Sequence, residues 1–355
     1  MSAPAGDAIR VMLADDSAVI RGLVSKWIEA ERDLSLVGTA VNGVEALRMA
    51  AQVKPDVLVL DIEMPQKSGL EALPELLKHS PATRVLMSST LTHRGAEVTL
   101  KALSLGAADY VTKPETGQAA AADFRRQLIE KVRALGGARP RQAMTTAARP
   151  STIVSGKLKP PLRIDALVIG CSTGGPQALR AVLPQIAAKV SAPILIVQHM
   201  PPVFTTILAQ HLSQAVGREV AEPKDGAQIG QNTIYLAPGD FHMRLTAKFG
   251  AARIELDKSA PVNFCRPAVD PLFISAADVF GSNVLGLVLT GMGSDGKRGA
   301  ERIVAKGGGV IAQDEASSVV WGMPGAVAQA QLCFSVAPLQ EIGAAVVNLS
   351  GARRL

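Results

Sequence analysis

Short apolar runs alternate with amphipathic stretches along the first 133 residues of the chain. The apolar runs have the length of buried strands, and each is followed by a segment whose apolar residues have helical spacing. Repeated units of this kind predict a parallel sheet with helices on both faces, a (βα)5 arrangement. The predicted strands are Arg10–Leu13, Leu36–Ala40, Val57–Leu60, Arg84–Met87 and Tyr110–Val111.

A second series of strand and helix units begins near residue 164 and predicts a second doubly wound, mainly parallel α/β sheet. Two further segments, Phe241–Leu245 and Ala252–Leu256, alternate apolar and polar residues on either side of Lys248-Phe249-Gly250. They predict an antiparallel hairpin attached to that sheet. The predicted strands of the sheet are Ala166–Ile169, Ile194–Val197, Thr233–Leu236, Leu285–Leu289, Gly309–Ala312 and Leu332–Val336.

Between the two series lies a stretch without any sustained period. Residues 136–163 contain two adjacent glycines, four prolines and several arginines and lysines. Such a composition is typical of a linker. The sequence therefore predicts an α/β protein with one domain over residues 8–135, a linker over 136–163 and a second domain over 164–350.

The composition of the 355-residue chain agrees with two domains, since 48% hydrophobic residues supply enough apolar material for two cores. No apolar run reaches the roughly 18 residues of a membrane-spanning helix, and the first ten residues lack the pattern of a secretory signal. We therefore expect a cytoplasmic protein. The chain has three cysteines, which are too scattered for a disulfide framework or a zinc site and which we expect to be buried free thiols: Cys171, Cys265 and Cys333.

The net charge of +6 does not indicate a nucleic-acid partner. Much of the excess lies between Arg125 and Arg163 and at Arg353 and Arg354, away from any base-reading motif. An aromatic content of 3% argues against a platform for single strands, and the β/α pattern leaves no room for a helix-turn-helix reader. We expect no nucleic acid among the partners.

Charged residues follow three of the strands predicted in the first half. Asp15 and Asp16 follow the first strand, Asp61 ends the third, and Lys113 follows the fifth. The carboxyl ends of parallel strands share one edge, so these side chains should converge there. Crowded carboxylates favour an oxygen-preferring cation such as Mg²⁺, beside which one carboxylate could accept a phosphoryl group. Taken singly, Asp15-Asp16-Ser17 could also be a helix N-cap and Asp61 a solvated loop acid, but the joint spacing favours the shared site.

Three segments resemble, in matching order, the receiver domain of bacterial two-component signalling, which has a flavodoxin-like fold: Ala14-Asp15-Asp16-Ser17, Leu60-Asp61-Ile62-Glu63-Met64-Pro65 and Thr112-Lys113-Pro114. The resemblance implies that Asp61 is the phosphoacceptor and that Lys113 contacts the phosphoryl oxygens. It also implies an Mg²⁺ site made by Asp15, Asp16, Asp61 and the backbone carbonyl of Glu63. The switch hydroxyl falls on Ser89 and its associated aromatic residue on Tyr110, although one residue of slippage would move the hydroxyl to Ser88 or Thr90.

A glycine-rich turn opens the second domain. Gly170-Cys171-Ser172-Thr173-Gly174 follows a predicted strand, precedes a predicted helix from Gln177 to Ala187, and has the Gly-x-Ser-x-Gly pattern of a nucleophile elbow. Ser172 is therefore a candidate nucleophile, beside helix amides that could stabilise an oxyanion. A plain helix cap stays open as another role for Ser172. A dinucleotide cradle is disfavoured, because a serine stands at its second glycine position and the next strand ends in Gln198-His199 rather than an acid.

A base and an acid are expected on the same edge. Among the five histidines, His199 is the one that ends a predicted central strand. Asp295, within Thr290-Gly291-Met292-Gly293-Ser294-Asp295-Gly296, follows another strand and could orient the imidazole, or it could cap the helix predicted from Lys297 to Ala305. We favour the triad. Arg266 could face an acidic substrate helix or serve as a surface cation.

The order Ser172, His199, Asp295 differs from that of α/β-hydrolases. Together with Gln198-His199-Met200 and Tyr235-Leu236-Ala237-Pro238-Gly239, these segments resemble the protein-glutamate methylesterase of bacterial chemotaxis, whose pattern spans roughly residues 164 to 347. The resemblance implies a Ser172-His199-Asp295 triad, oxyanion donors near Thr173 and Met292, and no cofactor for the esterase.

The same resemblance implies the partners. The substrates would be methylated chemoreceptors, whose glutamate γ-methyl esters are hydrolysed to release methanol and whose glutamines can be deamidated. A chemotaxis histidine kinase would phosphorylate Asp61, and the unphosphorylated receiver would cover the Ser172 edge. We expect a soluble monomer that acts on the cytoplasmic helices of membrane receptors. The alternative is a non-catalytic response regulator whose second domain binds a signalling partner.

Overall fold

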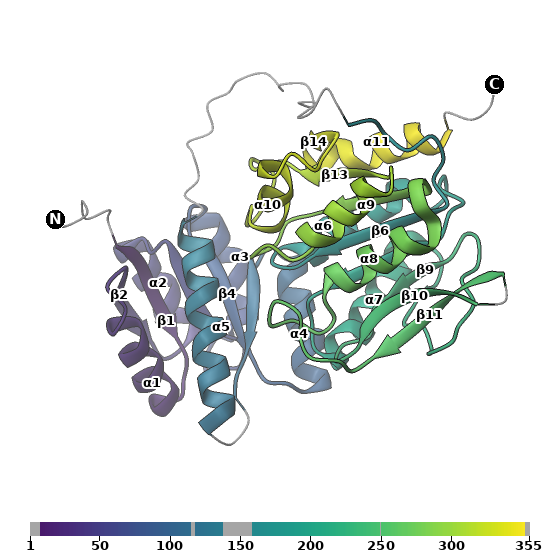
Figure 1. The fold of residues 1–355 in the computed structure, drawn as a ribbon. Coiled ribbons are helices and arrows are strands. Elements are labelled where there is room, and N and C mark those ends of the chain that lie inside the picture. Colours follow the sequence, from purple (N-terminus) through teal and green to yellow (C-terminus); the bar gives the residue numbers. More distant parts are fainter. Residues whose placement is uncertain (1–7, 115–117, 138–157, 249, 352–355) are drawn as a thin grey trace. The chain divides into compact units, whose positions relative to one another are not determined.

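The computed structural model describes residues 8–114, 118–137, 158–248 and 250–351. The chain divides into two compact units, one before and one after residues 138–157 (Figure 1). Most of the predicted linker 136–163 lies outside the described residues, but residues 136 and 137 belong to a helix. The boundaries 8–135, 136–163 and 164–350 stay predictions.

The first unit is a five-stranded parallel sheet in the order β2-β1-β3-β4-β5. Helix α1 contacts α5, whereas α2 contacts α3 and α3 contacts α4, so the helices form two groups on opposite faces. The elements are β1 (Ile9–Ala14), α1 (Ala18–Glu29), β2 (Leu34–Ala40), α2 (Gly43–Val53), β3 (Val57–Asp61), α3 (Gly69–His79), β4 (Arg84–Ser89), α4 (His93–Ser104), β5 (Asp109–Thr112) and α5 (Gln118–Gly137).

The second unit is a seven-stranded parallel sheet in the order β14-β13-β12-β6-β7-β9-β8. Its strands are β6 (Ala166–Cys171), β7 (Ile194–Gln198), β8 (Val220–Ala221), β9 (Ile234–Leu236), β12 (Val284–Val288), β13 (Gly309–Gln313) and β14 (Ser335–Ala337), and β10 (His242–Lys248) with β11 (Ala251–Asp257) forms a hairpin. Its helices are α6 (Gly175–Ile186), α7 (Pro202–Val216), α8 (Val269–Phe280), the short η1 (Gly281–Asn283), α9 (Lys297–Ala305), α10 (Met323–Gln329) and α11 (Leu339–Gly351).

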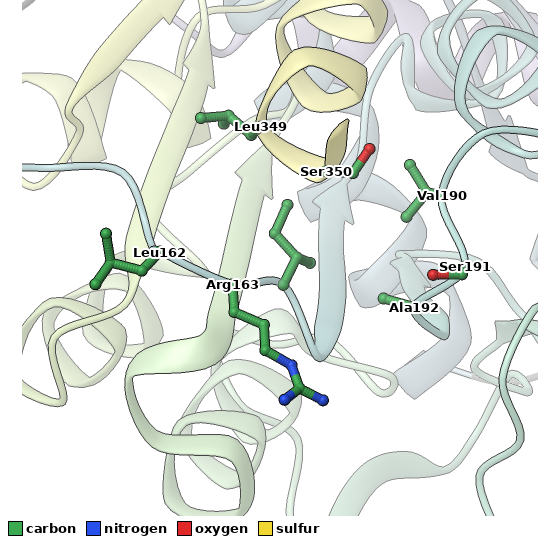
Figure 2. A pocket seen from close by; sticks show the side chains of 8 residues that line it. Leu162, Arg163, Val190, Ser191, Ala192, Leu349 and Ser350 are labelled. Carbon is green, nitrogen blue, oxygen red and sulfur yellow. The ribbon is translucent and has the colours of Figure 1, made fainter. Parts of the chain in front are cut away.

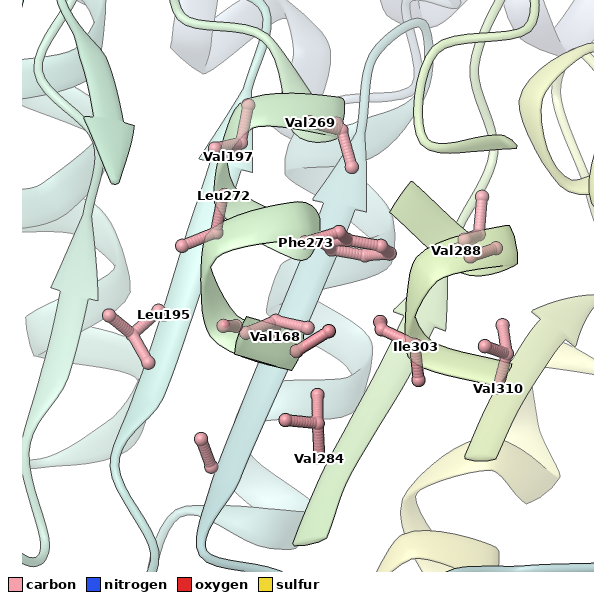
Figure 3. Close-up of a cluster of buried hydrophobic side chains, with 14 of the residues drawn as sticks. Val168, Leu195, Val197, Val269, Leu272, Phe273, Val284, Val288, Ile303 and Val310 are labelled. Atoms are coloured by element: carbon pink, nitrogen blue, oxygen red, sulfur yellow. The ribbon is translucent and has the colours of Figure 1, made fainter. Parts of the chain in front are cut away.

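The core of the second unit lies between its sheet and the helices α8 and α9. Valines of β6, β12 and β13 point at one face, where Leu272 and Phe273 of α8 and Ile303 of α9 cover them (Figure 3). All of these side chains are buried. Because strands covered on both faces must be apolar throughout, the central runs of β6 and β12 contain no polar side chain.

The predicted fold class is confirmed, with differences at the edges of the second sheet. The last strand was predicted at Leu332–Val336 but forms at Ser335–Ala337, because Leu332 packs against the hydrophobic core ahead of the strand. The two-residue β8 was not predicted. The hairpin of β10 and β11 is a separate two-stranded sheet rather than part of the large one, and Leu245 N donates to Ser275 Oγ of α8 at 3.0 Å.

In both sheets the strand order reverses at one point. The chain leaves β1 on one side for β2 and returns on the other side for β3, and it likewise leaves β6 for β7 and returns for β12. The loops at the carboxyl ends diverge at such a point and leave a crevice. None of the described helices is both long and apolar enough to cross a membrane.

Candidate functional site

The predicted acidic cluster forms at the reversal point of the first sheet. Oxygen atoms of Asp15, Asp16 and Asp61 lie within 4.8 Å of one another. The Nζ atom of Lys113 lies 2.9 Å from Asp15 Oδ2 and 2.9 Å from Asp61 Oδ2. The carboxylates of Asp15 and Asp61 are buried, and this one lysine compensates one of their two negative charges.

Burial dominates the electrostatics of Asp61. It raises the pKa of this carboxyl to about 6, although Lys113 acts in the opposite direction, and the charges of Asp15 and Asp16 add to the rise. Three carboxylates with hard oxygen donors at this separation fit Mg²⁺, which prefers such ligands. A cavity of about 650 Å³ opens beside them and is lined by Asp16, Ile62, Glu63, Met64, Pro65, Ser68, Leu70, Arg94 and Val98.

The predicted switch residues are buried at the same edge. Ser89 Oγ lies 3.2 Å from the carbonyl oxygen of Gly95 and accepts a hydrogen bond from Thr99 Oγ1 at 2.7 Å. Its neighbour Ser88 lies opposite Asp61 in the strand register, so the assignment of the hydroxyl to Ser89 stays a prediction. Tyr110 is buried, and burial raises the pKa of its phenol well above the usual value.

Ser172 is the first residue after β6, at the reversal point of the second sheet. Its amide donates to Thr290 O at 3.0 Å, and its carbonyl oxygen accepts from Gly175 N at 2.8 Å and from Gln198 Nε2 at 3.0 Å. The N-cap of α6 is Gly174, with a φ of 76°. The alternative role of Ser172 as that cap is therefore wrong.

His199 is the first residue after β7, which lies next to β6. The register pairs Cys171 with Gln198, and His199 N donates to Cys171 O at 3.3 Å, so Ser172 and His199 follow their strands side by side. The imidazole Nε2 lies 2.8 Å from Asp295 Oδ2. In the neutral tautomer that donates from Nε2 to this carboxylate, Nδ1 is left as a proton acceptor.

Asp295 is held by donors on several sides. Oδ1 accepts from Asp270 N at 3.1 Å and Oδ2 accepts from Val269 N at 2.6 Å, so this carboxylate sits on the N-terminus of α8. Burial alone would raise the pKa of Asp295, but His199 and the two helix amides outweigh it and lower the pKa. The carboxylate therefore stays ionised beside the imidazole. It does not cap α9, whose N-cap is Gly296, although Gly296 N also donates to Oδ1.

Burial by itself lowers the pKa of His199, but the Cys265 sulfur and the Asp295 carboxylate favour the protonated imidazole more strongly. The net effect raises the pKa of His199 above its usual value. Cys265 was expected to be a buried structural thiol, yet it is only half-buried and lies beside the imidazole, whereas Cys171 and Cys333 are buried. The expectation for Cys265 was wrong because its turn lies against Asp295, which accepts from Asn263 Nδ2 of that turn, rather than in a core.

The residues proposed as oxyanion donors come from two loops. Thr173 is buried and follows Ser172 directly, and Met292 is half-buried. A Cβ atom on Gly291 would lie 2.9 Å from Ser172 Cβ, which shows how closely the loop after β12 approaches the serine. The role of both residues as donors stays a prediction.

Several residues at this edge were not found from the sequence. Asn263 Nδ2 donates to Asp295 Oδ1 at 3.2 Å, and the buried Gln198 holds the Ser172 carbonyl. Their signal was only adjacency to predicted site residues. Arg266, which could have faced a substrate, instead donates to Asp240 Oδ1 from Nε at 3.0 Å and to the carbonyls of the 258–259 segment.

A separate cavity of about 170 Å³ lies at the amino-terminal edge of the second sheet, away from Ser172 and His199 (Figure 2). Its wall includes Arg163, which forms an ion pair with Asp165. The remaining lining residues are Leu162, Ile164, Val190, Ser191, Ala192, Leu349 and Ser350. The cavity contains none of the predicted site residues.

Comparisons with known proteins match each half of the chain to a family. Residues 167–346 match the family described as CheB methylesterase, and residues 11–123 match the response regulator receiver domain. A protein-glutamate methylesterase/protein-glutamine glutaminase of Rhodopseudomonas palustris strain BisB5 is 51% identical over 363 residues, covering 97% of this chain and 94% of the relative. Protein-glutamate methylesterase/protein-glutamine glutaminase 2 of Caulobacter vibrioides is 52% identical over 337 residues, covering 94% of this chain and 97% of the relative.

A solved structure is also similar. The crystal structure of the Thermotoga maritima CheB methylesterase catalytic domain has 41% sequence identity and a TM-score of 0.51. It covers 52% of this chain, and 98% of that domain is matched. The likeness thus concerns the second unit.

Proposed function

Since this chain belongs to the CheB methylesterase family and carries a response regulator receiver domain, we propose that Ser172, His199 and Asp295 catalyse its reaction under the control of Asp61. The protein is a hydrolase that removes methyl groups from chemoreceptor glutamates, with glutaminase activity implied by the same relatives. The observation that carries the residue assignment is the hydrogen bond between His199 and Asp295 at 2.8 Å, next to the strand end that bears Ser172.

The reaction starts from the neutral imidazole, so only molecules in which His199 is unprotonated react. His199 Nδ1 takes the hydroxyl proton of Ser172 while the serine oxygen attacks the γ-carbonyl carbon of the methylated glutamate. The amides of Thr173 and Met292 stabilise the oxyanion. Collapse of this intermediate breaks the bond to the methoxy group, which leaves as methanol with the proton from His199. Water, deprotonated by His199, then cleaves the acyl ester and restores Ser172.

Control is assigned to the receiver. A chemotaxis histidine kinase supplies the phosphoryl group to Asp61, with Lys113 contacting its oxygens and Ser89 and Tyr110 responding. Mg²⁺ bound by Asp15, Asp16, Asp61 and the backbone carbonyl of Glu63 would neutralise charge on those oxygens. The added phosphoryl charge of about −2 shifts the receiver between two states and uncovers the esterase edge. The protein acts as a cytoplasmic monomer on the methylated helices of membrane receptors.

Methanol release from methylated receptor membranes tests the esterase assignment. Ser172→Ala should lower the rate to background, because no hydroxyl remains to form the acyl-enzyme. Ser294→Ala is the matched control, since this exposed serine lies next to Asp295 on the same edge and has no assigned role. Methanol release by Ser172→Ala at the wild-type rate would contradict the assignment and favour the non-catalytic alternative.

A phosphodonor tests the control. Asp61→Asn should keep the basal rate and lose all stimulation by a small-molecule phosphodonor with Mg²⁺. Asp56→Asn should keep the stimulation. Asp56 directly precedes the same strand at its other end, and its side chain accepts a hydrogen bond from Arg10 N at 2.8 Å, which an asparagine oxygen can also do. Stimulation that survives in Asp61→Asn would show that phosphorylation acts elsewhere.

A further inference from the structure

The esterase edge contains a second buried aspartate that the reaction above does not use. Asp270 lies in the first turn of α8 and is 3% exposed. Its backbone amide donates to Asp295 Oδ1 at 3.1 Å. Its own Oδ1 accepts from Gly299 N at 2.8 Å, in the first turn of α9. One residue therefore contacts both the triad acid and the helix that follows that acid in the chain.

The two aspartates form a reciprocal arrangement. Asp295 directly precedes the cap of α9 but binds the amides at the N-terminus of α8, and Asp270 belongs to α8 but binds an amide at the N-terminus of α9. The N-cap residues of the two helices, Ala268 and Gly296, have no side chain that could satisfy these amides. The N-terminus of α8 thus binds the carboxylate that precedes α9, and the N-terminus of α9 binds a carboxylate of α8.

The packing of α8 on α9 makes this arrangement rigid. A Cβ atom on Gly299 would lie 2.3 Å from Phe273 Cβ, so a glycine is needed for the helices to approach this closely. A Cβ atom on Gly296 would likewise lie 3.0 Å from Val269 Cγ1. Phe273 is fully buried. A shift of α9 relative to α8 would therefore move Asp295 away from His199.

We propose that Asp270 is a positioning residue for the esterase reaction, because it completes the reciprocal cap that holds Asp295 in register with His199. The inference rests on the proposed function and adds a residue to it. An error of about 1 Å in the placement of a catalytic group costs roughly 100-fold in rate, so a residue that acts only through another can have a large effect.

The charge of Asp270 gives this role a measurable signature. The groups around it are Asp295, Arg298 in the first turn of α9, and the amides of Gly296 and Gly299, with His199 beyond Asp295. Burial and Asp295 raise the pKa of Asp270 to about 6, against those amides and Arg298. Above that pH the ionised carboxylate favours the imidazolium form of His199, so its removal should lower the pKa of His199.

The test compares Asp270→Asn with wild type. The asparagine oxygen can still accept from Gly299 N, so the fold should be kept while the charge is lost. A neutral amide holds Gly299 N less strongly than a carboxylate does, so the cap is weakened and we expect kcat for methanol release to fall about tenfold with KM within twofold. The acidic limb of kcat/KM should move to lower pH. Asp270→Ser, which keeps a capping oxygen, should show the same shift of the limb.

Asp278→Asn is the matched control. Asp278 lies in the same helix and also binds α9, where Oδ1 accepts from Arg302 Nε at 2.9 Å, but this pair is exposed and lies at the far end of α8. It should leave kcat and the pH limb unchanged. Unchanged kcat and an unmoved limb in both Asp270 variants, or a limb that moves to higher pH, would overturn the proposal.

An NMR titration of His199 in the Ser172→Ala background separates this proposal from the proposed function. The pKa of His199 should be lower in Asp270→Asn than in its parent, whether or not the chain releases methanol. An equal pKa in the two proteins overturns the role of Asp270. Absence of methanol release from the wild-type chain would instead refute the esterase assignment.

Discussion

Replacing Asp295 by asparagine should remove most of the esterase activity while leaving the size and shape of the side chain unchanged. The aspartate is an acceptor at both oxygens: Oδ2 faces Val269 N and His199 Nε2, and Oδ1 faces Asp270 N, Gly296 N and Asn263 Nδ2. Asparagine must turn an NH₂ group toward one of these two sets. The set at Oδ2 is smaller, so we expect the NH₂ group there.

The magnitude follows from that orientation. The NH₂ group donates to His199 Nε2, so the imidazole proton moves to Nδ1, which is the nitrogen that must accept from Ser172. In the serine protease whose triad aspartate was changed in the same way, the wrong tautomer lowered kcat about 10⁴-fold, and we expect a loss of that order. The same NH₂ group also faces Val269 N and leaves a buried donor unpaired, which should cost about 1–3 kcal/mol of unfolding free energy.

Two measurements check this prediction. Methanol release gives kcat, and urea unfolding gives the change in stability. Asn263→Gly is the control, since it removes one donor to the same carboxylate from an exposed residue, tolerates the φ of 51° at this position and leaves the tautomer of His199 unchanged. Its kcat should stay within about tenfold of wild type, since a single exposed donor is worth about 1 kcal/mol. If Asp295→Asn kept kcat within tenfold of wild type, Asp295 would not orient the catalytic base.

Three further changes test other contacts of this edge. Phe264→Gly should raise the free energy of unfolding by about 1 kcal/mol relative to Phe264→Ala in urea titrations, because Phe264 has a φ of 62°, which glycine adopts without strain. Gly291→Ala should lower kcat for methanol release and cost about 1–3 kcal/mol of stability, because the new Cβ would lie 2.4 Å from Met323 Sδ and 2.9 Å from Ser172 Cβ; unchanged kcat would mean that this loop does not set the serine. Cys265→Ala should lower the pKa of His199 and move the acidic limb of kcat/KM to lower pH, since the sulfur favours the imidazolium form; a limb that stays in place would remove Cys265 from the electrostatics of the site.

The sequence was sufficient for those parts of the site that follow strand ends. Ser172, His199 and Asp295 each come directly or soon after an apolar run, so the rule that parallel strands share a carboxyl edge brings them together. The sequence was insufficient for Asp270, because its pattern indicates only an acidic residue in the first turn of a helix. Its partner Gly299 is 29 residues away, and only the packing of α8 on α9 makes them neighbours.

The edges of the second sheet show a different limit. The strand β8 has two residues, Val220 and Ala221, and no run of that length can be distinguished from a loop. For β14, the apolar run starts before the strand does, because Leu332 and Cys333 pack in the hydrophobic core ahead of the first strand residue. Apolar character reports burial rather than strand pairing, and at a sheet edge the two are not the same.

The two sheets place an aspartate at the same kind of position but give it opposite electrostatics. Asp61 is buried among other carboxylates, and both effects raise its pKa, to about 6, although Lys113 opposes the rise. Asp295 is as deeply buried, but amides at the N-terminus of α8 and the imidazole of His199 lower its pKa. A carboxylate that accepts a phosphoryl group needs surrounding charges that can change when the group is added. A carboxylate that holds an imidazole in one tautomer instead needs a fixed set of hydrogen-bond donors. The sign of the pKa shift therefore separates Asp61, the proposed phosphoacceptor, from Asp295, the proposed triad acid, although the topology around the two is the same.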